Sequence, residues 1–327
     1  MLETAAPGTP MNRRTSLGRL VFALAVALAL GGCSTYATYL RDAITHPPKI
    51  EAIRTSSGQQ IDLYSIDIGP PPRRALFFVS GSGCASLAYF MRAYFENMTG
   101  SWTIYAVQKA GVAKNDMGFF CSQSFNDHYY FEALRERYNA ALRKVIRRHG
   151  EVAGVLGVSE GGDFAALLAQ DNPQVRRLAV IGSGGLPWRA VGKILDARAG
   201  DDAFARTFAE ITSAPLSTVK TALGYPYRYW SSIVDFDPAA VYLSLKIPIL
   251  VVFGEADQSV PLESARFLEA RFQEAGKENF QLLTIAGARH ALIAGGKNLK
   301  PEVMTRLDAF FAQENARRQA KPDSHPD

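Results

Sequence analysis

A serine, a histidine and an aspartate that could cooperate in acyl transfer stand far apart in the chain, each after a predicted strand. Ser159 lies in Gly157-Val158-Ser159-Glu160-Gly161-Gly162, which follows an apolar run and opens a helical pattern. A nucleophilic serine on such a sharp turn needs small neighbours two residues away on either side, and Gly157 and Gly161 meet that need. The motif predicts a nucleophile, although a glycine-rich turn without chemistry has the same composition.

The serine hydroxyl is a weak nucleophile until a base removes its proton, and the chain has five histidines. His290 follows the last predicted strand, where a loop would return it to the carboxyl edge of the sheet. We predict His290 as the base and keep His128, which precedes a helix, as the alternative. The remaining three fall in the predicted tether, at a helix end and in the tail: His46, His149 and His325.

An imidazole base needs a carboxylate that fixes its tautomer and stabilises its cation. Asp257 lies on a loop between a predicted strand at 249–253 and a predicted helix at 262–275. We predict Asp257 as this acid, with Glu255 and Asp235 as the competing carboxylates.

The elements that must position these residues alternate between strands and helices along most of the chain. An N-terminal antiparallel hairpin is predicted over 49–54 and 60–66. The following pattern predicts strands at 75–79, 102–107, 152–158, 178–181, 249–253 and 280–285, and helices at 131–149, 161–170, 262–275 and 301–313. Such alternation is typical of an α/β fold, a mostly parallel sheet with helices on both faces. Between about residues 186 and 246 no buried-strand pattern occurs, so we predict a helical insertion there.

The order Ser159, Asp257, His290 resembles that of the α/β-hydrolase superfamily. The matching pieces are the glycine-rich motif at 157–162, Phe-Gly-Glu-Ala-Asp-Gln-Ser-Val-Pro at 253–261 and Gly-Ala-Arg-His at 287–290. The resemblance spans roughly residues 50 to 314 and implies that the insertion at 186–246 is a lid. It also implies a serine hydrolase that works without a cofactor.

Two backbone N–H groups are needed to hold the oxyanion of an acyl-transfer intermediate. The N–H of Glu160, directly after the nucleophile, is the first candidate. The second comes from Ser80-Gly81-Ser82-Gly83, where we nominate Ser82 and keep Gly81 as the alternative. Members of the superfamily often have His-Gly where this chain has Ser80-Gly81, but a backbone donor tolerates that difference.

Composition limits the classes of function. The 327 residues are 47% hydrophobic and 20% charged, which excludes a disordered chain, and a net charge of +5 gives no reason to expect a nucleic-acid partner. No Cys/His cluster has zinc spacing. We expect a carboxylesterase-like enzyme acting on a small-molecule acyl substrate. The alternatives are a serine peptidase or aminopeptidase of the same fold and a catalytically silent envelope binding protein. The sequence leaves the oligomeric state open.

The N-terminal segment has the features of an export signal. Three arginines precede the apolar run 20–30, which ends in Gly31-Gly32-Cys33-Ser34. This ending resembles the lipobox of bacterial lipoproteins, which implies a signal peptide over 1–32, lipidation of Cys33 and a tether over 33–48. Membrane attachment would then follow through the lipid, with Ser34 favouring the outer membrane facing the periplasm. The hydrolase domain is predicted over 49–314 and a polar tail over 315–327.

Cys84 and Cys121 are the two remaining cysteines. Outside the cytoplasm an even pair suggests a disulfide, which would close a loop of nearly forty residues. Two buried thiols are the equal alternative.

Overall fold

The computed structural model describes residues 44–313 of the chain. The chain divides into a first unit that ends at His46, of which residues 44–46 are described, and a second unit that begins at Pro47. The strands and helices named below belong to the second unit. The predicted signal peptide at 1–32, the predicted lipidation site Cys33 and the predicted tail at 315–327 lie outside the described residues.

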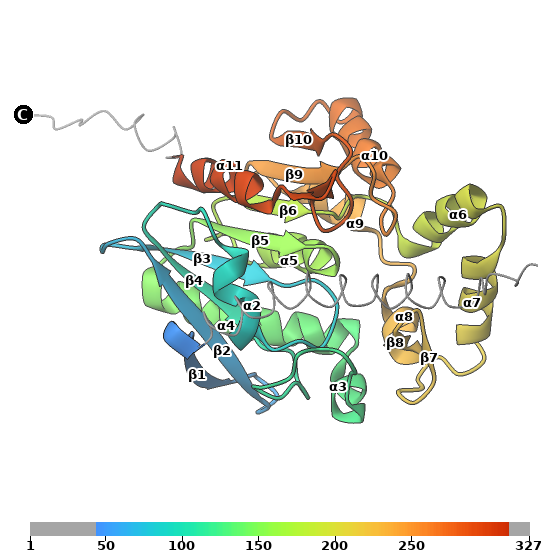
Figure 1. Ribbon diagram of the computed structural model, residues 1–327, viewed down its shortest axis with the longest axis horizontal. Helices are drawn as coiled ribbons and strands as arrows, with labels where there is room; N and C mark the ends of the chain where they lie inside the picture. Colours follow the sequence, from blue (N-terminus) through green and yellow to red (C-terminus); the bar gives the residue numbers. More distant parts are fainter. Residues whose placement is uncertain (1–43, 314–327) are drawn as a thin grey trace, which may run out of the picture. The chain divides into compact units, whose positions relative to one another are not determined.

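Eight strands of the described chain form one sheet (Figure 1). Their order across the sheet is β1 (Lys49–Arg54), β2 (Gln60–Ile68), β4 (Trp102–Val107), β3 (Arg74–Val79), β5 (Gly154–Val158), β6 (Leu178–Ile181), β9 (Ile249–Gly254) and β10 (Phe280–Ile285). β3 has β4 on one side and β5 on the other, so the chain reverses its direction across the sheet there. Ligand sites in α/β proteins lie at the carboxyl ends of strands beside such a reversal.

The pairings separate an antiparallel edge from a parallel body. β1 pairs with β2 and β2 pairs with β4 in antiparallel fashion, whereas the other neighbours are parallel. All six residues of β9 are buried, as expected for a strand that is covered on both faces. The predicted fold class, a mostly parallel sheet with an N-terminal antiparallel hairpin, is confirmed.

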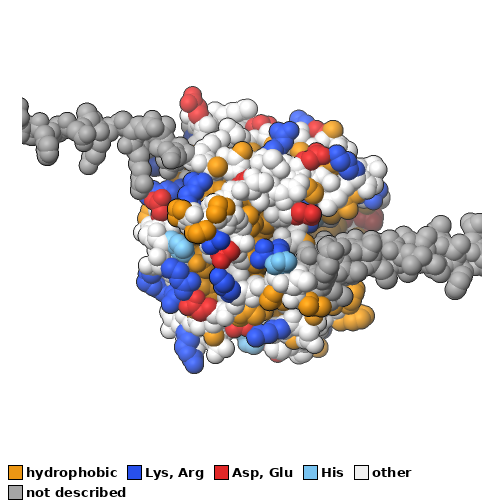
Figure 2. Space-filling model, turned by 60° about the vertical axis from the view of Figure 1, so that its left-hand side comes forward, with side chains coloured by type: hydrophobic (Ala, Val, Ile, Leu, Met, Phe, Trp, Pro, Cys, Tyr) orange, Lys and Arg blue, Asp and Glu red, His pale blue; other side chains and the backbone are white. Residues whose placement is uncertain are grey.

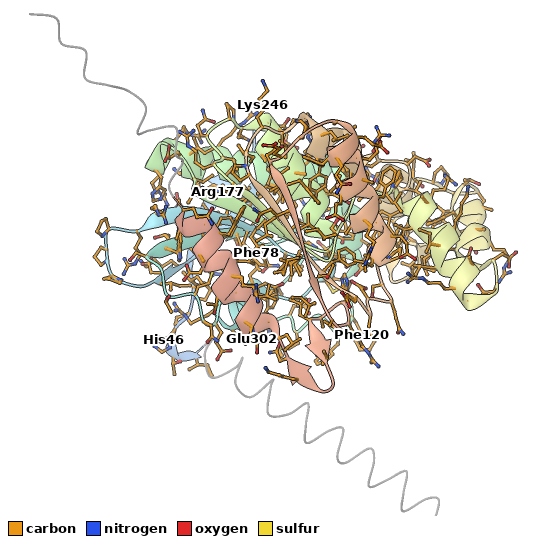
Figure 3. All side chains as sticks on the ribbon, turned by 90° about the horizontal axis from the view of Figure 1, so that it is seen from above. His46, Phe78, Phe120, Arg177, Lys246 and Glu302 are labelled. Atoms are coloured by element: carbon orange, nitrogen blue, oxygen red, sulfur yellow. A yellow bond between two sulfur atoms is a disulfide. The ribbon has the colours of Figure 1, made fainter. Side chains whose placement is uncertain are left out.

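Helices cover both faces of the sheet and bury alternate side chains of its strands. The helices α4 (Phe131–His149), α5 (Glu160–Asp171) and α10 (Leu262–Glu274) share one apolar cluster with Phe77. The helices α2 (Leu87–Tyr94) and α11 (Lys300–Ala312) share the other with Phe78, which Figure 3 labels. Neighbouring residues of a strand point to opposite faces, so Phe77 and Phe78 each anchor one layer.

The insertion between β6 and β9 is mainly helical. It contains α6 (Trp188–Ala199), α7 (Ala203–Ile211), the short strands β7 (Thr221–Ala222) and β8 (Tyr225–Pro226), α8 (Tyr227–Ile233) and α9 (Pro238–Ser244). Figure 1 shows α6, α7 and α8 beside one end of the sheet. In contrast, α9 packs on α5 and α10 and so joins the helical layer on the sheet. The aromatic side chains of α8 are mostly buried: Tyr227, Tyr229 and Trp230.

Outside the insertion, four elements of the described chain were not predicted, namely α2 and, in addition, α3 (Gln123–His128), β11 (Ile293–Ala294) and β12 (Lys297–Asn298). On the surface, Lys and Arg are interspersed with Asp and Glu over the face drawn in Figure 2. At the end of α4, for example, Lys144 and Arg148 both form ion pairs with Glu51. Within residues 44–313, no helix has the length and apolar character needed to cross a bilayer.

Candidate active site

Ser159 stands on the sharp turn between β5 and α5. Its backbone has φ 53° and ψ −125°, a conformation that residues other than glycine rarely adopt and that stores roughly 1–3 kcal/mol of strain. A methyl group at Gly157 would collide with the carbonyl oxygen of Gly161, and one at Gly161 would collide with that of Val79. The glycines at these positions are therefore required by space, since the turn presses against the end of β3.

The side chains of Ser159, His290 and Asp257 form a continuous hydrogen-bonded chain. His290 Nε2 lies 2.9 Å from Ser159 Oγ, and His290 Nδ1 lies 2.7 Å from Asp257 Oδ2. The other carboxylate oxygen of Asp257 accepts hydrogen bonds from the backbone N–H groups of Ser259 and Val260, at 2.8 and 3.0 Å. Asp257 is only 3% exposed, so this carboxylate is fixed in the orientation that holds the imidazole.

The competing residues lie in other surroundings. His128 Nδ1 is 2.8 Å from the carbonyl oxygen of Ser124 on its own helix. Asp235 forms an ion pair with Arg189 on the insertion, and Glu255 is exposed. None of these three groups occurs in the hydrogen-bonded chain at Ser159.

The two predicted oxyanion donors flank the nucleophile from separate segments. Glu160 is the first residue of α5, where backbone N–H groups have no partner within the helix. Ser82 lies in the loop 80–83 after β3, and a methyl group at Gly81 would come 3.4 Å from Ser159 Cβ. Burial raises the pKa of Tyr225 from the insertion, and a side-chain hydrogen bond with Ser82 opposes that rise. The loop 80–83 therefore lies between the nucleophile and the insertion.

A buried ion pair joins the same loop to the start of α5. Lys109 Nζ donates to the carbonyl oxygen of Gly81 at 2.6 Å and to Glu160 Oε2 at 3.2 Å. Tyr129 donates its hydroxyl proton to the same oxygen of Glu160. Burial lowers the pKa of Lys109, whereas the charge and hydrogen bond of Glu160 raise it. For Tyr129, burial and the Glu160 charge both raise the pKa, which keeps the phenol protonated as a donor.

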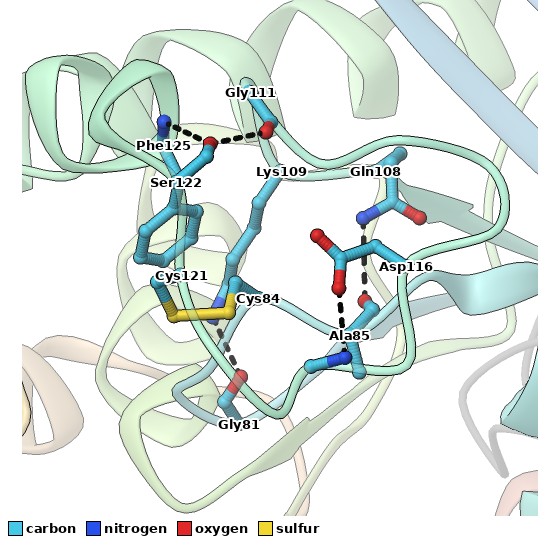
Figure 4. Close-up of a disulfide and its surroundings, with 11 residues drawn as sticks. Gly81, Cys84, Ala85, Gln108, Lys109, Gly111, Asp116, Cys121, Ser122 and Phe125 are labelled. Carbon is cyan, nitrogen blue, oxygen red and sulfur yellow. Dashed lines mark hydrogen bonds between the residues drawn. A yellow bond between two sulfur atoms is a disulfide. The ribbon is translucent and has the colours of Figure 1, made fainter.

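A disulfide anchors the other end of the loop 80–83 (Figure 4). Cys84 directly follows the loop and is bonded to Cys121, with 5.5 Å between their Cα atoms. Of the two alternatives left by the sequence, the structure has the disulfide. Next to it, Ser122 begins α3 by accepting a hydrogen bond from the N–H of Phe125 and donates to the carbonyl oxygen of Gly111.

A small pocket opens beside Ser159, between α5, the turn after β6, the start of the insertion and the segment before α10. Its polar lining consists of Ser159, Glu160, Asp163, Ser183 and Ser264. No group of three or more His, Cys, Asp or Glu side chains within residues 44–313 is arranged to hold a metal ion. The pocket therefore offers hydrogen-bonding side chains to a substrate next to the nucleophile.

Asp163 is the unusual residue in this pocket. Its carboxylate is 5% exposed and accepts a hydrogen bond from Ser183 Oγ at 3.2 Å. Burial raises the pKa of Asp163 to about 7; the Ser183 hydrogen bond opposes the rise and the Glu160 charge adds to it. The group thus changes its charge near neutral pH, directly beside the site.

Four polar residues around Ser159 were not predicted from the sequence, namely Lys109, Tyr129, Asp163 and Ser183. A signal existed for Asp163, since it is the sole charged residue in the otherwise apolar stretch 161–169. Lys109 likewise comes two residues after the apolar strand β4, where its side chain can still be buried. Ser183 and Tyr129 carry no comparable signal, because each stands among residues typical of turns and helix ends.

The sheet, the two helical layers and the serine on its strained turn agree with the family model that matches this chain, and together they define an α/β-hydrolase of the serine type. The family model for the prolyl oligopeptidase family matches residues 147–317, which is more than half of the chain. The chain belongs to the prolyl oligopeptidase family.

Individual relatives of known activity include both esterases and peptidases. Esterase EstD of Thermotoga maritima is 33% identical over 84 residues, which make up 25% of this chain and only 20% of that enzyme. The esterase domain of a Rhodothermus marinus protein has a TM-score of 0.54 at 16% identity, covering 80% of this chain and 97% of that one. Dipeptidyl peptidase 4 of Porphyromonas gingivalis has a TM-score of 0.53 at 16% identity, covering 81% and 35%. At 16% identity, the similarity to these two structures shows a shared fold and gives no evidence about activity.

Proposed function

We propose that this hydrolase cleaves carboxylic esters of small molecules through an acyl-enzyme on Ser159. The observation that carries the proposal is the chain of two hydrogen bonds, 2.9 Å from Ser159 to His290 and 2.7 Å from His290 to Asp257. This is the geometry in which an imidazole can remove the serine proton while a buried carboxylate stabilises the resulting cation.

In the first half-reaction, Ser159 Oγ attacks the ester carbonyl carbon and its proton passes to His290 Nε2. The carbonyl oxygen becomes an oxyanion, for which the N–H groups of Glu160 and Ser82 are the proposed donors. When the intermediate collapses, the bond to the alkoxy oxygen breaks and the leaving alcohol takes the proton from His290. A water molecule then gives a proton to His290 and attacks the acyl carbon. The bond between the acyl carbon and Ser159 Oγ breaks as His290 returns the proton to Oγ, which releases the carboxylic acid and restores Ser159.

A serine peptidase or aminopeptidase is the second candidate, which the family match supports. The ester is favoured because its alkoxide leaves more readily than an amine, so the site needs fewer additional contacts to the leaving group. A binding protein without catalysis is the third candidate, and the intact hydrogen-bonded chain at Ser159 argues against it.

Covalent labelling with a fluorophosphonate probe tests whether Ser159 is a nucleophile. We expect the wild type and the control variant Ser213→Ala, at an exposed serine, to be labelled, and Ser159→Ala to remain unlabelled. A folded wild type that does not react would contradict the enzymatic proposal and favour a binding protein.

The bond that is cleaved is tested by comparing p-nitrophenyl esters with aminoacyl anilides. We expect turnover of the esters, lost in Ser159→Ala. Turnover of the anilides alone would replace the esterase proposal with the peptidase.

A further inference from the structure

The pocket beside Ser159 combines apolar walls with a buried carboxylate. Its apolar walls come from Leu186, Trp188, Val191 and Val260. Asp163 lies in the first turn of α5, directly after the turn that carries Ser159, and both residues line this pocket. A substrate carbonyl held at Ser159 would therefore place a short acyl chain against Asp163.

The carboxylate of Asp163 has capacity to bind a donor. Of its two oxygens, Oδ1 accepts from Ser183, and no hydrogen bond to Oδ2 is formed by residues 44–313. No Lys, Arg or His of the same residues forms an ion pair with Asp163. Buried carboxylates are normally paired, because an unpaired charge removed from water is strongly disfavoured.

An ammonium group fits these observations best. It brings the missing positive charge and three N–H donors, of which one can reach Asp163 Oδ2 and another the lone pairs of Ser183 Oγ. Asp163 is only 5% exposed, so little water reaches its carboxylate, and a charge-assisted hydrogen bond is stronger in such surroundings. A neutral hydroxyl could donate to the same oxygen but would leave the charge unpaired.

We propose that Asp163 and Ser183 form a subsite for an ammonium group on a short acyl chain, so that the substrates are esters of small amino acids. This inference rests on the proposed function, since it concerns the acyl part of the ester that Ser159 attacks. It makes Asp163 the residue that determines substrate specificity in the pocket.

Matched p-nitrophenyl esters test the subsite, because a methyl group and an ammonium group have similar size. One pair is 3-aminopropanoyl and butanoyl, and a second is 2-aminopropanoyl and 2-methylpropanoyl. For each pair we expect a wild-type kcat/KM ratio, corrected for uncatalysed hydrolysis, of at least 10 in favour of the ammonium ester. Asp163→Asn should lower that ratio roughly 10- to 100-fold, whereas Asp62→Asn on β2, outside the pocket, should preserve it.

Further esters keep the proposal testable even if Asp163→Asn does not fold. In the wild type, N-acetylation of the amine should lower kcat/KM at least tenfold, and a 3-hydroxypropanoyl ester should resemble the butanoyl ester. A ratio near 1 in both pairs, an equal gain from the hydroxyl, or a ratio that survives in Asp163→Asn would overturn the subsite. If these neutral esters are hydrolysed, such a result leaves the proposed hydrolase in place; if no ester is hydrolysed, both proposals fail.

Discussion

At the scale of single residues, Asp163 works against folding at neutral pH. Its pKa rises from 3.8 to about 7 on folding, mainly because of burial, so the folded protein binds this proton more tightly than the unfolded chain does. Below about pH 4 the carboxyl is protonated in both the folded and the unfolded state, and its contribution to the free energy of unfolding is fully present. That contribution is lost as the pH rises through about 7, where the folded protein must also give up the proton. A residue that disfavours the fold under such conditions is typical of a functional position.

Removing this carboxylate should therefore change the pH dependence of stability. We expect the free energy of unfolding of Asp163→Asn, relative to the wild type, to increase by up to about 4 kcal/mol between pH 4 and pH 8. Urea unfolding at several pH values measures this difference, with Asp62→Asn as the matched control. Parallel pH profiles for the wild type and Asp163→Asn would contradict the prediction.

The residues brought together at Ser159 could be predicted from the sequence because each follows a strand and has small or turn-forming neighbours. Asp257 and His290 come after β9 and β10, whose apolar character is plain, and parallel strands end at one edge. Lys109 and Asp163 could not be predicted in the same way. Whether a charged side chain is buried depends on which distant segment covers it, and a single sequence does not contain that information.

At the scale of elements, the Lys109–Glu160 pair connects the loop 80–83 to the helix that carries the nucleophile. Both side chains are almost fully buried, and Glu160 Oε1 has no hydrogen-bond partner within the described residues. Loss of the lysine would leave a buried carboxylate held by Tyr129 alone. We regard Lys109 as a positioning residue for the loop.

A double-mutant cycle tests this connection. We expect Lys109→Met to lower the free energy of unfolding by about 3–5 kcal/mol and to reduce kcat more than it changes KM. Lys109→Met combined with Glu160→Gln should recover most of the lost stability but not the lost kcat. If the loss in the double variant, measured by urea unfolding, equals the sum of the losses in Lys109→Met and Glu160→Gln, the two side chains act independently.

Elements that are long and strongly patterned could be predicted, and short ones could not. The helix Phe131–His149 matches its predicted range because its apolar spacing is regular and Gly150 closes it with φ 79°. The helices α2 and α3 have eight and six residues, too few for the spacing to separate them from loops. The strands β7 and β8 have two residues each and arise from contacts within the insertion.

At the scale of the whole molecule, the disulfide restrains a long loop of the unfolded chain. Cys84 and Cys121 are separated by 37 positions, for which the chain-entropy model gives about 4 kcal/mol of stabilisation. We expect Cys84→Ser with Cys121→Ser to lose about this amount in urea unfolding. The wild type with a reductant should lose the same amount, and the double variant should not respond to reductant.

Attachment to a membrane is a separate prediction, which concerns residues outside the described range. We propose that Cys33 carries a lipid and that the protein partitions into detergent when it is made in a cell that processes lipoproteins. Cys33→Ser should move it to the aqueous phase without altering the specific activity towards esters. Unchanged detergent partitioning of Cys33→Ser would contradict the anchor.

Because a disulfide lies next to the loop 80–83, we expect the activity of a purified sample to depend on whether the chain folded in a reducing or an oxidising compartment. Reducing cytosol keeps thiols apart, whereas an oxidising compartment joins them. Protein produced in a reducing host would lack the disulfide, and the loop 80–83 beside Ser159 would be less restrained. The kcat of such a sample would then depend on how far its cysteines had been oxidised. The redox conditions under which the chain folds and its activity would then be linked through a single sulfur–sulfur bond.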